Sequence, residues 1–262
     1  MSTPIFQVDA FTNQAFSGNP AAVCILNEPQ SHGWMQNVAR EMNLSDTAFL
    51  IQSNGRLDLR WFTPESEVDL CGHATLATAH ILWKEGYINS EKELSFSTKS
   101  GILRAKGRGQ WIELAFPNEN ESQVTAPEGL SEALGAKPVY VGKNRMDYLV
   151  ELESETDVRN LSPDFRTLKA IPSRGFIVTA RSDSDDYDFI SRFFAPGLGI
   201  DEDPVTGSAH CCLGPFWQKK TGKNSFTAYQ ASQRGGLVKV KMAEKNVLLE
   251  GQAVTIFRGV IC

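Results

Sequence analysis

Short runs of alternating apolar and polar residues dominate the first half of the chain and predict half-buried strands. A helix interrupts them between Ser31 and Met42, where apolar residues recur at helical spacing. Asn54-Gly55 lies between two such runs and predicts a hairpin turn. The predicted strands of this half are Ile5–Phe11, Ala21–Leu26, Thr47–Ile51, Leu57–Phe62, Leu94–Ser97, Gly101–Ala105 and Trp111–Phe116.

The second half repeats this order loosely. Ser162 and Pro163 predict the start of a short helix, with Ser162 as its N-cap. Strands outnumber helices in both halves, and several are joined by short antiparallel turns, which predicts an α+β fold. The predicted strands here are Val139–Val141, Tyr148–Leu152, Gly175–Ala180, Asp188–Phe194, Leu237–Met242, Asn246–Glu250 and Gln252–Phe257.

A polar, acidic stretch over residues 118–127 separates the two halves. We interpret it as a linker between an N-terminal half, residues 1–117, and a C-terminal half, residues 128–262; a long surface loop is the alternative. A chain of 262 residues is long enough for two such halves.

Two helices of small residues are predicted, Cys71–Lys84 and Thr206–Lys220. Alanine and threonine cover nearly every face of the first, which indicates a helix buried on all sides. A sheet curled around that helix explains its composition. A helix on a flat sheet, the simpler alternative, needs small residues on one face only.

The segments leading into these helices are similar. One reads Asp69-Leu-Cys-Gly-His-Ala-Thr75, and the other Asp201-Glu-Asp-Pro-Val-Thr-Gly-Ser208. Polar residues at a glycine-containing helix start suit the binding of an anion. The candidate residues are Cys71, Gly72, His73, Asp203, Thr206, Gly207 and Ser208. Ordinary helix caps and a buried, hydrogen-bonded histidine are the structural alternatives.

Bulk properties restrict the partners. A net charge of −5 with interspersed signs argues against nucleic acid, and no long apolar run predicts a membrane span. The start of the chain does not resemble a signal peptide, so a cytoplasmic location is expected. Five cysteines, an odd number, indicate reduced thiols.

Metal and nucleotide sites are weakly indicated. Cysteine and histidine are present at Cys71, His73, His80, His210, Cys211 and Cys212, but their spacing matches no zinc signature. Gly197-Leu-Gly199 lacks the third glycine of a dinucleotide fingerprint. We therefore predict neither a metal nor a cofactor.

Six ordered motifs carry a resemblance over nearly the whole chain: Phe6-Gln-Val-Asp-Ala-Phe11, Gly18-Asn-Pro-Ala-Ala22, Glu41-Met-Asn-Leu-Ser-Asp-Thr-Ala-Phe49, Arg60-Trp-Phe-Thr-Pro64, Val68-Asp-Leu-Cys-Gly-His-Ala-Thr75 and Glu202-Asp-Pro-Val-Thr-Gly-Ser-Ala209. The sequence resembles the PhzF family of phenazine biosynthesis-like proteins, which is similar to diaminopimelate epimerase. The resemblance implies two pseudo-symmetric halves, each a curled mixed sheet around a central helix, with the site between them. It also implies a cofactor-free isomerase that forms a homodimer.

The resemblance implies residue roles as well. In the phenazine enzyme an acid moves a proton to isomerise trans-2,3-dihydro-3-hydroxyanthranilate, and Asp46 stands where the family normally has Glu. His73 and Asp203 match the other catalytic positions. We therefore predict an isomerase acting by acid–base proton transfer on a small carboxylate-bearing substrate. A non-catalytic binding or interaction protein on the same fold, and a thiol-dependent racemase or epimerase that uses Cys71, are the alternatives.

Overall fold

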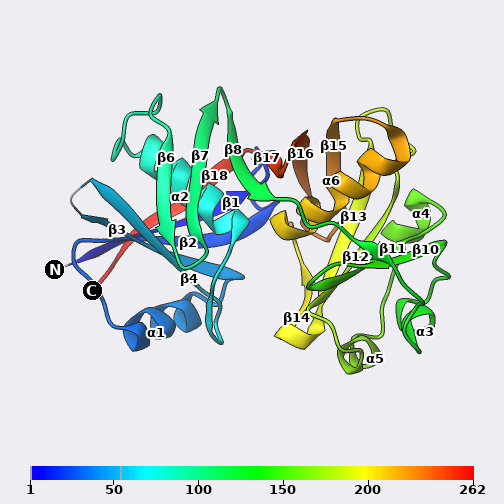
Figure 1. Cartoon of the computed structure of the whole chain (residues 1–262). Coiled ribbons are helices and arrows are strands. Elements are labelled where there is room, and N and C mark those ends of the chain that lie inside the picture. Colours follow the sequence, from blue (N-terminus) through cyan, green and yellow to red (C-terminus); the bar gives the residue numbers. More distant parts are fainter. Residues whose placement is uncertain (1, 54) are drawn as a thin grey trace. The chain divides into compact units, whose positions relative to one another are not determined.

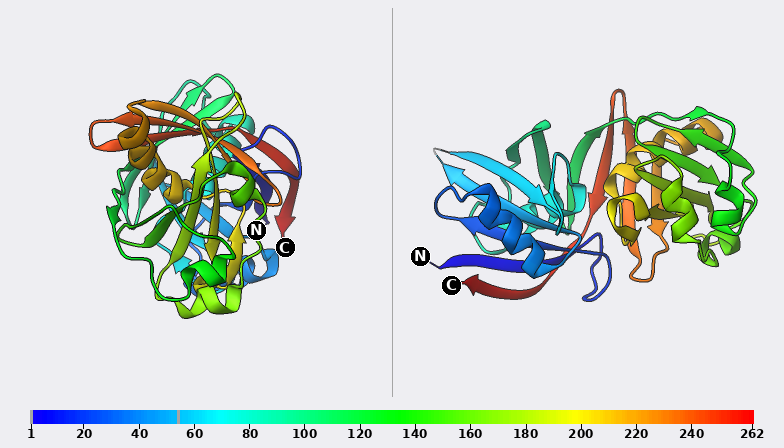
Figure 2. Two further views of the ribbon diagram at one scale, coloured as in Figure 1. Left: turned by 90° about the vertical axis from the view of Figure 1, so that its right-hand side faces the viewer. Right: turned by 90° about the horizontal axis from the view of Figure 1, so that it is seen from below.

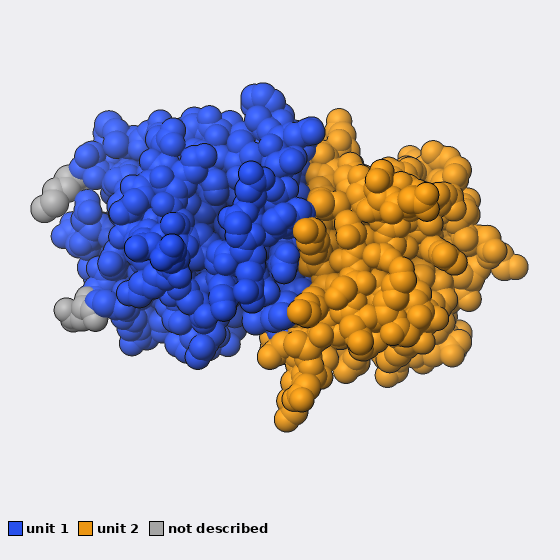
Figure 3. All heavy atoms as spheres, turned by 90° about the horizontal axis from the view of Figure 1, so that it is seen from above, with its two compact units in different colours: residues 1–116, 248–262 blue, residues 117–247 orange. Residues whose placement is uncertain are grey.

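The computed structural model of the chain describes residues 2–53 and 55–262, so the turn predicted at Asn54 lies outside the described residues. The chain forms two compact units (Figure 3). Unit 1 contains residues 1–116 and 248–262, and unit 2 contains residues 117–247. None of the helices in the described ranges has the length and apolar character to cross a membrane.

Unit 1 is built on a mixed sheet. β2 (Asn19–Leu26) and β3 (Asp46–Ser53) are parallel, and so are β4 (Arg56–Phe62) and β6 (Leu94–Thr98), whereas β1 with β2 and β3 with β4 are antiparallel. The C-terminal strand β18 (Ala253–Ile261) pairs with β1 (Thr3–Ala10), and the two run side by side in Figures 1 and 2. The remaining strands are β5 (Glu67–Val68), β7 (Gly101–Arg108) and β8 (Trp111–Pro117).

Two helices complete unit 1. The helix α1 (His32–Met42) begins at the N-cap Ser31, whose hydroxyl accepts a hydrogen bond from the Trp34 N–H group. The helix α2 (Gly72–Lys84) packs against β1, β2, β3 and β18. Four successive residues of α2, numbers 76–79, are buried. Because successive helical residues point about 100° apart, α2 is enclosed on all sides, as its composition predicts.

Unit 2 repeats this plan around the helix α6 (Gly207–Thr221). β11 (Asp147–Glu151) is parallel to β12 (Gly175–Arg181), and β13 (Phe189–Ala195) is parallel to β15 (Ser225–Gln230). The remaining elements are β9 (Ser122–Gln123), β10 (Tyr140–Lys143), β14 (Ile200–Asp203), β16 (Gly236–Ala243), α3 (Leu130–Leu134), α4 (Glu155–Arg159), α5 (Phe165–Ala170) and the 3-10 turn η1 (Pro196–Leu198). The strand β17 (Asn246–Gly251) crosses the boundary between the units, with residues 248–251 in unit 1.

The same order of pairings in the two units establishes the internal repeat. In unit 1 the parallel pair β2–β3 precedes α2 in the chain, and the strands of the parallel pair β4–β6 stand before and after it. In unit 2 the pair β11–β12 precedes α6, and the strands of the pair β13–β15 stand before and after it. In this correspondence α2 matches α6, so the two similar sequence segments occupy equivalent places at the starts of equivalent helices.

The unit boundaries differ from those expected from the sequence. Residues 248–262 lie in unit 1, because β18 extends its sheet by pairing with β1. The segment 118–127 is part of unit 2: β9 within it pairs with β10, and Glu121 is buried there. β9 and β18 occupy equivalent places. Each follows the last strand of one repeat in the chain and pairs with the first strand of the other repeat.

The helix predicted at Ser162 begins later. α5 starts at Phe165, and its N-cap is Asp164, whose carboxylate accepts hydrogen bonds from the Arg166 and Thr167 N–H groups. The short helices α3 and α4 were not predicted, since five residues are too few to show an apolar period.

Candidate active site

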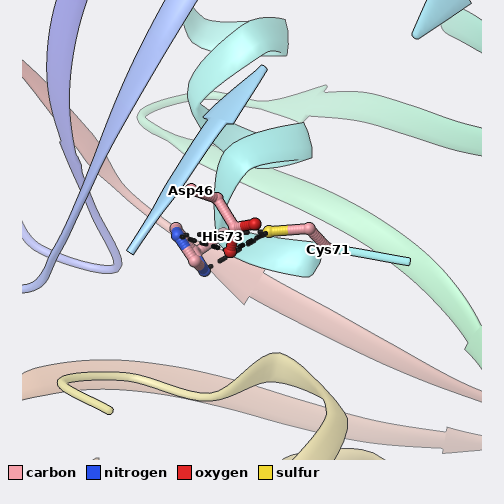
Figure 4. Close-up of side chains that lie close together, drawn as sticks. All are labelled: Asp46, Cys71 and His73. Carbon is pink, nitrogen blue, oxygen red and sulfur yellow. Dashed lines mark hydrogen bonds and ion pairs between the residues drawn. The ribbon is translucent and has the colours of Figure 1, made fainter. Parts of the chain in front are cut away.

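Asp46, Cys71 and His73 form a buried cluster in unit 1 (Figure 4). α1 ends at Asn43 in the left-handed conformation, and three residues later the chain enters β3 with Asp46 as its first residue. β3 is the neighbour of β2 inside the sheet and packs against α2, at whose start Cys71 and His73 lie. The turn after α1 therefore places the carboxylate against the helix N-terminus.

The distances within the cluster are those of direct contact. The Cys71 thiol donates a hydrogen bond to Asp46 Oδ2 at 3.2 Å, and His73 Nε2 lies 3.7 Å from the same oxygen. Cys71 Sγ lies 3.5 Å from His73 Nδ1 and 4.0 Å from His73 Nε2. Cys71 is also the N-cap of α2, where its sulfur accepts from the Ala74 N–H group.

His73 is uncharged in this environment. Its burial lowers its pKa to about 3, because the imidazolium form loses its hydration. The Asn19 side-chain amide lies 3.3 Å from His73 Nδ1 and fixes the orientation of the ring. At neutral pH the histidine can therefore donate one hydrogen bond from one ring nitrogen and accept one at the other, but it does not supply a positive charge.

The second sequence segment forms a separate group in unit 2. The Thr206 hydroxyl donates to Asp203 Oδ2 at 2.5 Å, and the Thr206 N–H group donates to Gln230 Oε1 at 2.9 Å. The amide of Gln230 donates to the Asp203 carbonyl oxygen at 2.7 Å. Both polar groups of Thr206 thus stabilise the turn before α6, and this buried glutamine fixes the position of Asp203.

Gly207 and Ser208 begin α6 and are placed beside an ion pair. Arg174 makes a bidentate ion pair with the fully buried Asp147 and also donates to Ser208 Oγ at 3.0 Å. The first N–H groups of a helix have no partner within the helix, and the helix dipole makes this end positive. The start of α6 therefore presents N–H groups and a hydroxyl, with a guanidinium behind them, as an arrangement that favours a carboxylate.

The other candidate metal ligands lie elsewhere. His80 Nε2 is 3.0 Å from Thr255 Oγ1, and His210 Nδ1 is 2.8 Å from the Thr206 carbonyl oxygen. Burial raises the pKa of the Cys211 and Cys212 thiols, which keeps both protonated. Within residues 2–53 and 55–262, the one group of three potential ligand side chains is Asp46, Cys71 and His73.

A cavity of about 610 Å³ opens in unit 1 beside α1, and none of the predicted site residues lines it. Glu67 lies at its wall between Arg60 and Lys99, and its hydrogen bonds to Arg60 in particular lower its pKa to about 2. The carboxylate is thus already neutralised by its neighbours.

Comparison with known proteins decides the family. Residues 8–259 match the family described as phenazine biosynthesis-like protein. The chain belongs to this family. Among its relatives, an uncharacterized isomerase of Halalkalibacterium halodurans is 59% identical over 260 residues, which are 99% of this chain and 98% of that protein. The resemblance inferred from the six motifs is thereby confirmed.

Solved structures of the family agree with the fold. A PhzF family protein of Enterococcus faecalis has a TM-score of 0.96 at 42% identity, with 100% of both chains covered. A predicted epimerase of Pseudomonas aeruginosa, at 21% identity and a TM-score of 0.76, has the same fold over 99% of each chain. The predicted α+β fold of the epimerase type is confirmed.

Three residues that support the site are not predicted from the sequence, because nothing in it marks them as special. Asn19 lies inside a turn motif, Arg174 is one of many arginines, and Gln230 ends an ordinary strand. The signal is a buried polar side chain for Asn19 and Gln230, and an ion pair with the buried Asp147 for Arg174; both are visible only in three dimensions.

Proposed function

We propose that the chain is a cofactor-independent isomerase that moves a proton within a small carboxylate-bearing metabolite, with Asp46 as the group that carries the proton. The observation that carries this proposal is the position of the Asp46 carboxylate, which is buried and held at 3.2 Å by the Cys71 thiol beside His73. The names of relatives, such as the isomerase of Halalkalibacterium halodurans, support the reaction class.

Asp46 would accept a proton from one carbon of the substrate and return it to another. His73, which stays neutral at physiological pH, would hold the carboxylate and a substrate polar group by hydrogen bonds. Asp203 would act as the second acid or base, since Thr206 and Gln230 fix its position. The family resemblance assigns Gly72, Gly207 and Ser208 to binding of the substrate carboxylate, a role that N–H groups at a helix start suit. The homodimer and the cytoplasmic location stay predictions.

Incubation with small carboxylic acids in deuterated water tests the proposal, with trans-2,3-dihydro-3-hydroxyanthranilate among them. The parent protein is expected to introduce solvent deuterium into one of these acids, as detected by mass spectrometry. Asp46→Asn should reduce the rate at least about a hundredfold, because a neutral amide cannot carry a proton. Asp58→Asn is the matched control, since Asp58 pairs with Arg56 outside the cluster.

Asp46→Glu measures how strictly the geometry is set. The longer side chain moves the carboxylate by roughly 1 Å, and a misplacement of that size changes rates by on the order of a hundredfold. The proposal fails if no acid gains deuterium, or if Asp46→Asn exchanges at the rate of the parent. Binding of a metabolite without turnover, unaffected by Asp46→Glu, would instead indicate a non-catalytic binding protein.

A thiol-dependent racemase that uses Cys71 is the second candidate function. The contact of 3.2 Å between Cys71 Sγ and Asp46 Oδ2 favours it, because the carboxylate is placed to accept the thiol proton. Cys71→Ser separates the two candidates: it abolishes exchange if the thiolate is the base, and it preserves most of the exchange if Asp46 is.

A further inference from the structure

The ligand atoms of Asp46, Cys71 and His73 all lie within 4.8 Å of one another. We infer that these three side chains bind one zinc-class divalent cation, and that the bound cation blocks the proton transfer proposed for Asp46. The inhibitory part of this inference rests on the proposed function, whereas the binding part rests on the geometry of the three side chains alone.

The distances fit a tetrahedral zinc site. Zinc bonds of about 2.0–2.2 Å to nitrogen or oxygen and about 2.3 Å to sulfur, at tetrahedral angles, separate the ligand atoms by about 3.3–3.6 Å. The observed separations are 3.2 Å for oxygen and sulfur, 3.7 Å for nitrogen and oxygen, and 4.0 Å for sulfur and nitrogen. Side-chain shifts of less than about 0.5 Å convert the cluster into three legs of a tetrahedron.

The chemistry of the three groups suits a soft divalent cation. Thiolate and imidazole are preferred zinc ligands, and a carboxylate is the common third. One thiolate and one carboxylate balance the two positive charges, so the loaded site is neutral, as a buried site requires. A single cysteine, histidine and aspartate leave a fourth position for water.

The proton balance is specific. Coordination replaces the hydrogen bond from Cys71 to Asp46, and the thiol proton leaves to solvent. His73 binds through Nε2 and keeps its proton on Nδ1. The Asn19 side chain, 3.3 Å from Nδ1, presents its amide oxygen to that proton after a half-turn of the amide group. Asn19 is therefore a positioning residue for the metal-binding form of His73.

Inhibition follows from the identity of the ligands. The carboxylate oxygen that would carry the proton is the one in contact with both Cys71 and His73. Once that oxygen is bonded to a cation, its basicity falls and it no longer accepts a substrate proton. The same cluster would thus act as the proton carrier when metal-free and as a closed site when loaded.

Titration of the metal-free chain of 262 residues with zinc chloride against a competing chelator tests binding. We expect one zinc per chain and the release of one proton, measured by calorimetry in buffers of different ionisation enthalpy. Cobalt(II) should give a thiolate-to-cobalt charge-transfer band. Cys71→Ser and His73→Ala should each weaken zinc binding at least about a hundredfold, and Asn19→Ala about tenfold.

The controls are a surface cysteine and a surface histidine. Cys262→Ser removes the exposed thiol, and His32→Ala removes a histidine 3.5 Å from a Glu67 carboxylate oxygen; neither should change the affinity or the cobalt band. Thermal unfolding in the absence of metal verifies that each variant is folded. The binding inference is overturned if no zinc binds, or if folded Cys71→Ser binds it with the affinity of the parent.

Solvent-deuterium exchange with and without zinc then tests inhibition. Stoichiometric zinc should stop the exchange, and a chelator should restore it. Faster exchange in the presence of zinc would overturn the inhibitory part and indicate a metal-assisted reaction. Because zinc binding is measured without any substrate, a failure of the proposed function leaves the binding result intact, and the reverse also holds.

Discussion

Burial keeps two histidines of the helix starts uncharged, and this links the stability of the fold to pH. Burial lowers the pKa of His73 to about 3 and that of His210 to about 4, against an ordinary value of 6.5. Below pH 6.5 the unfolded chain binds protons at these residues that the folded protein does not bind. Above pH 6.5 the contribution of the two histidines to the free energy of unfolding does not change with pH. As the pH falls from 6.5 toward 4, the folded protein loses stability.

His210→Gln tests this linkage away from the proposed proton carrier. Each such histidine lowers the free energy of unfolding by about 1.4 kcal/mol per pH unit within the window. Urea unfolding of the parent and of the variant should be measured at about pH 7 and about pH 5. The loss in the free energy of unfolding between the two pH values should be about 2 kcal/mol smaller in the variant. His73 and His80 remain to give the rest of the slope. An equal loss in parent and variant would mean that His210 is protonated in the folded state.

At the scale of elements, two helix glycines predict opposite effects of the same substitution. A Cβ atom added at Gly214 in α6 would lie 2.9 Å from Met242 Sδ and 3.0 Å from Val240 Cγ1, whereas one added at Gly33 in α1 meets nothing within 4 Å. Gly214→Ala should therefore destabilise the protein by about 1–3 kcal/mol, because the overpacked core outweighs its gain in helix propensity. Gly33→Ala should stabilise it by about 0.5–1 kcal/mol. Thermal unfolding of both variants measures the difference, and a stabilised Gly214→Ala would show that β16 yields to the added methyl group.

The helices and strands also show how much of the fold can be predicted from the sequence. Local signals sufficed for α1, α2 and α6, since capping, small residues and terminal glycines are read within one segment. They predicted β18 as a strand over Gln252–Phe257 but assigned it to the C-terminal half, and they missed β9, because pairing with a strand of the other repeat is a long-range contact that leaves no local trace. For the same reason motif similarity indicated Asp46, Cys71 and His73, but not Asn19 or Gln230, which meet their partners only in the fold.

At the scale of the whole molecule, unit 1 is discontinuous in sequence, which gives it a specific requirement for folding. Residues 1–116 contain most of its sheet and both of its helices, but β18 arrives from the far end of the chain and pairs with all eight residues of β1. Without β18, the edge of β1 and part of the surface that encloses α2 are uncovered.

A permuted chain tests this requirement. Thr3 pairs with Ile261, so the two ends are near enough for a short hairpin loop to join residue 262 to residue 2. A chain that runs from Leu248 to Cys262, through that loop, and on through residues 2–116 contains every residue of unit 1 except the first. We expect it to unfold cooperatively on heating, as followed by circular dichroism, and to resist proteolysis.

A fragment of residues 1–117, the N-terminal half expected from the sequence, should lack a cooperative transition and be cleaved rapidly. The two chains differ chiefly in residues 248–262, which contain β18 and the end of β17, so equal stability of the two would mean that these residues contribute little and that unit 1 is complete at residue 117.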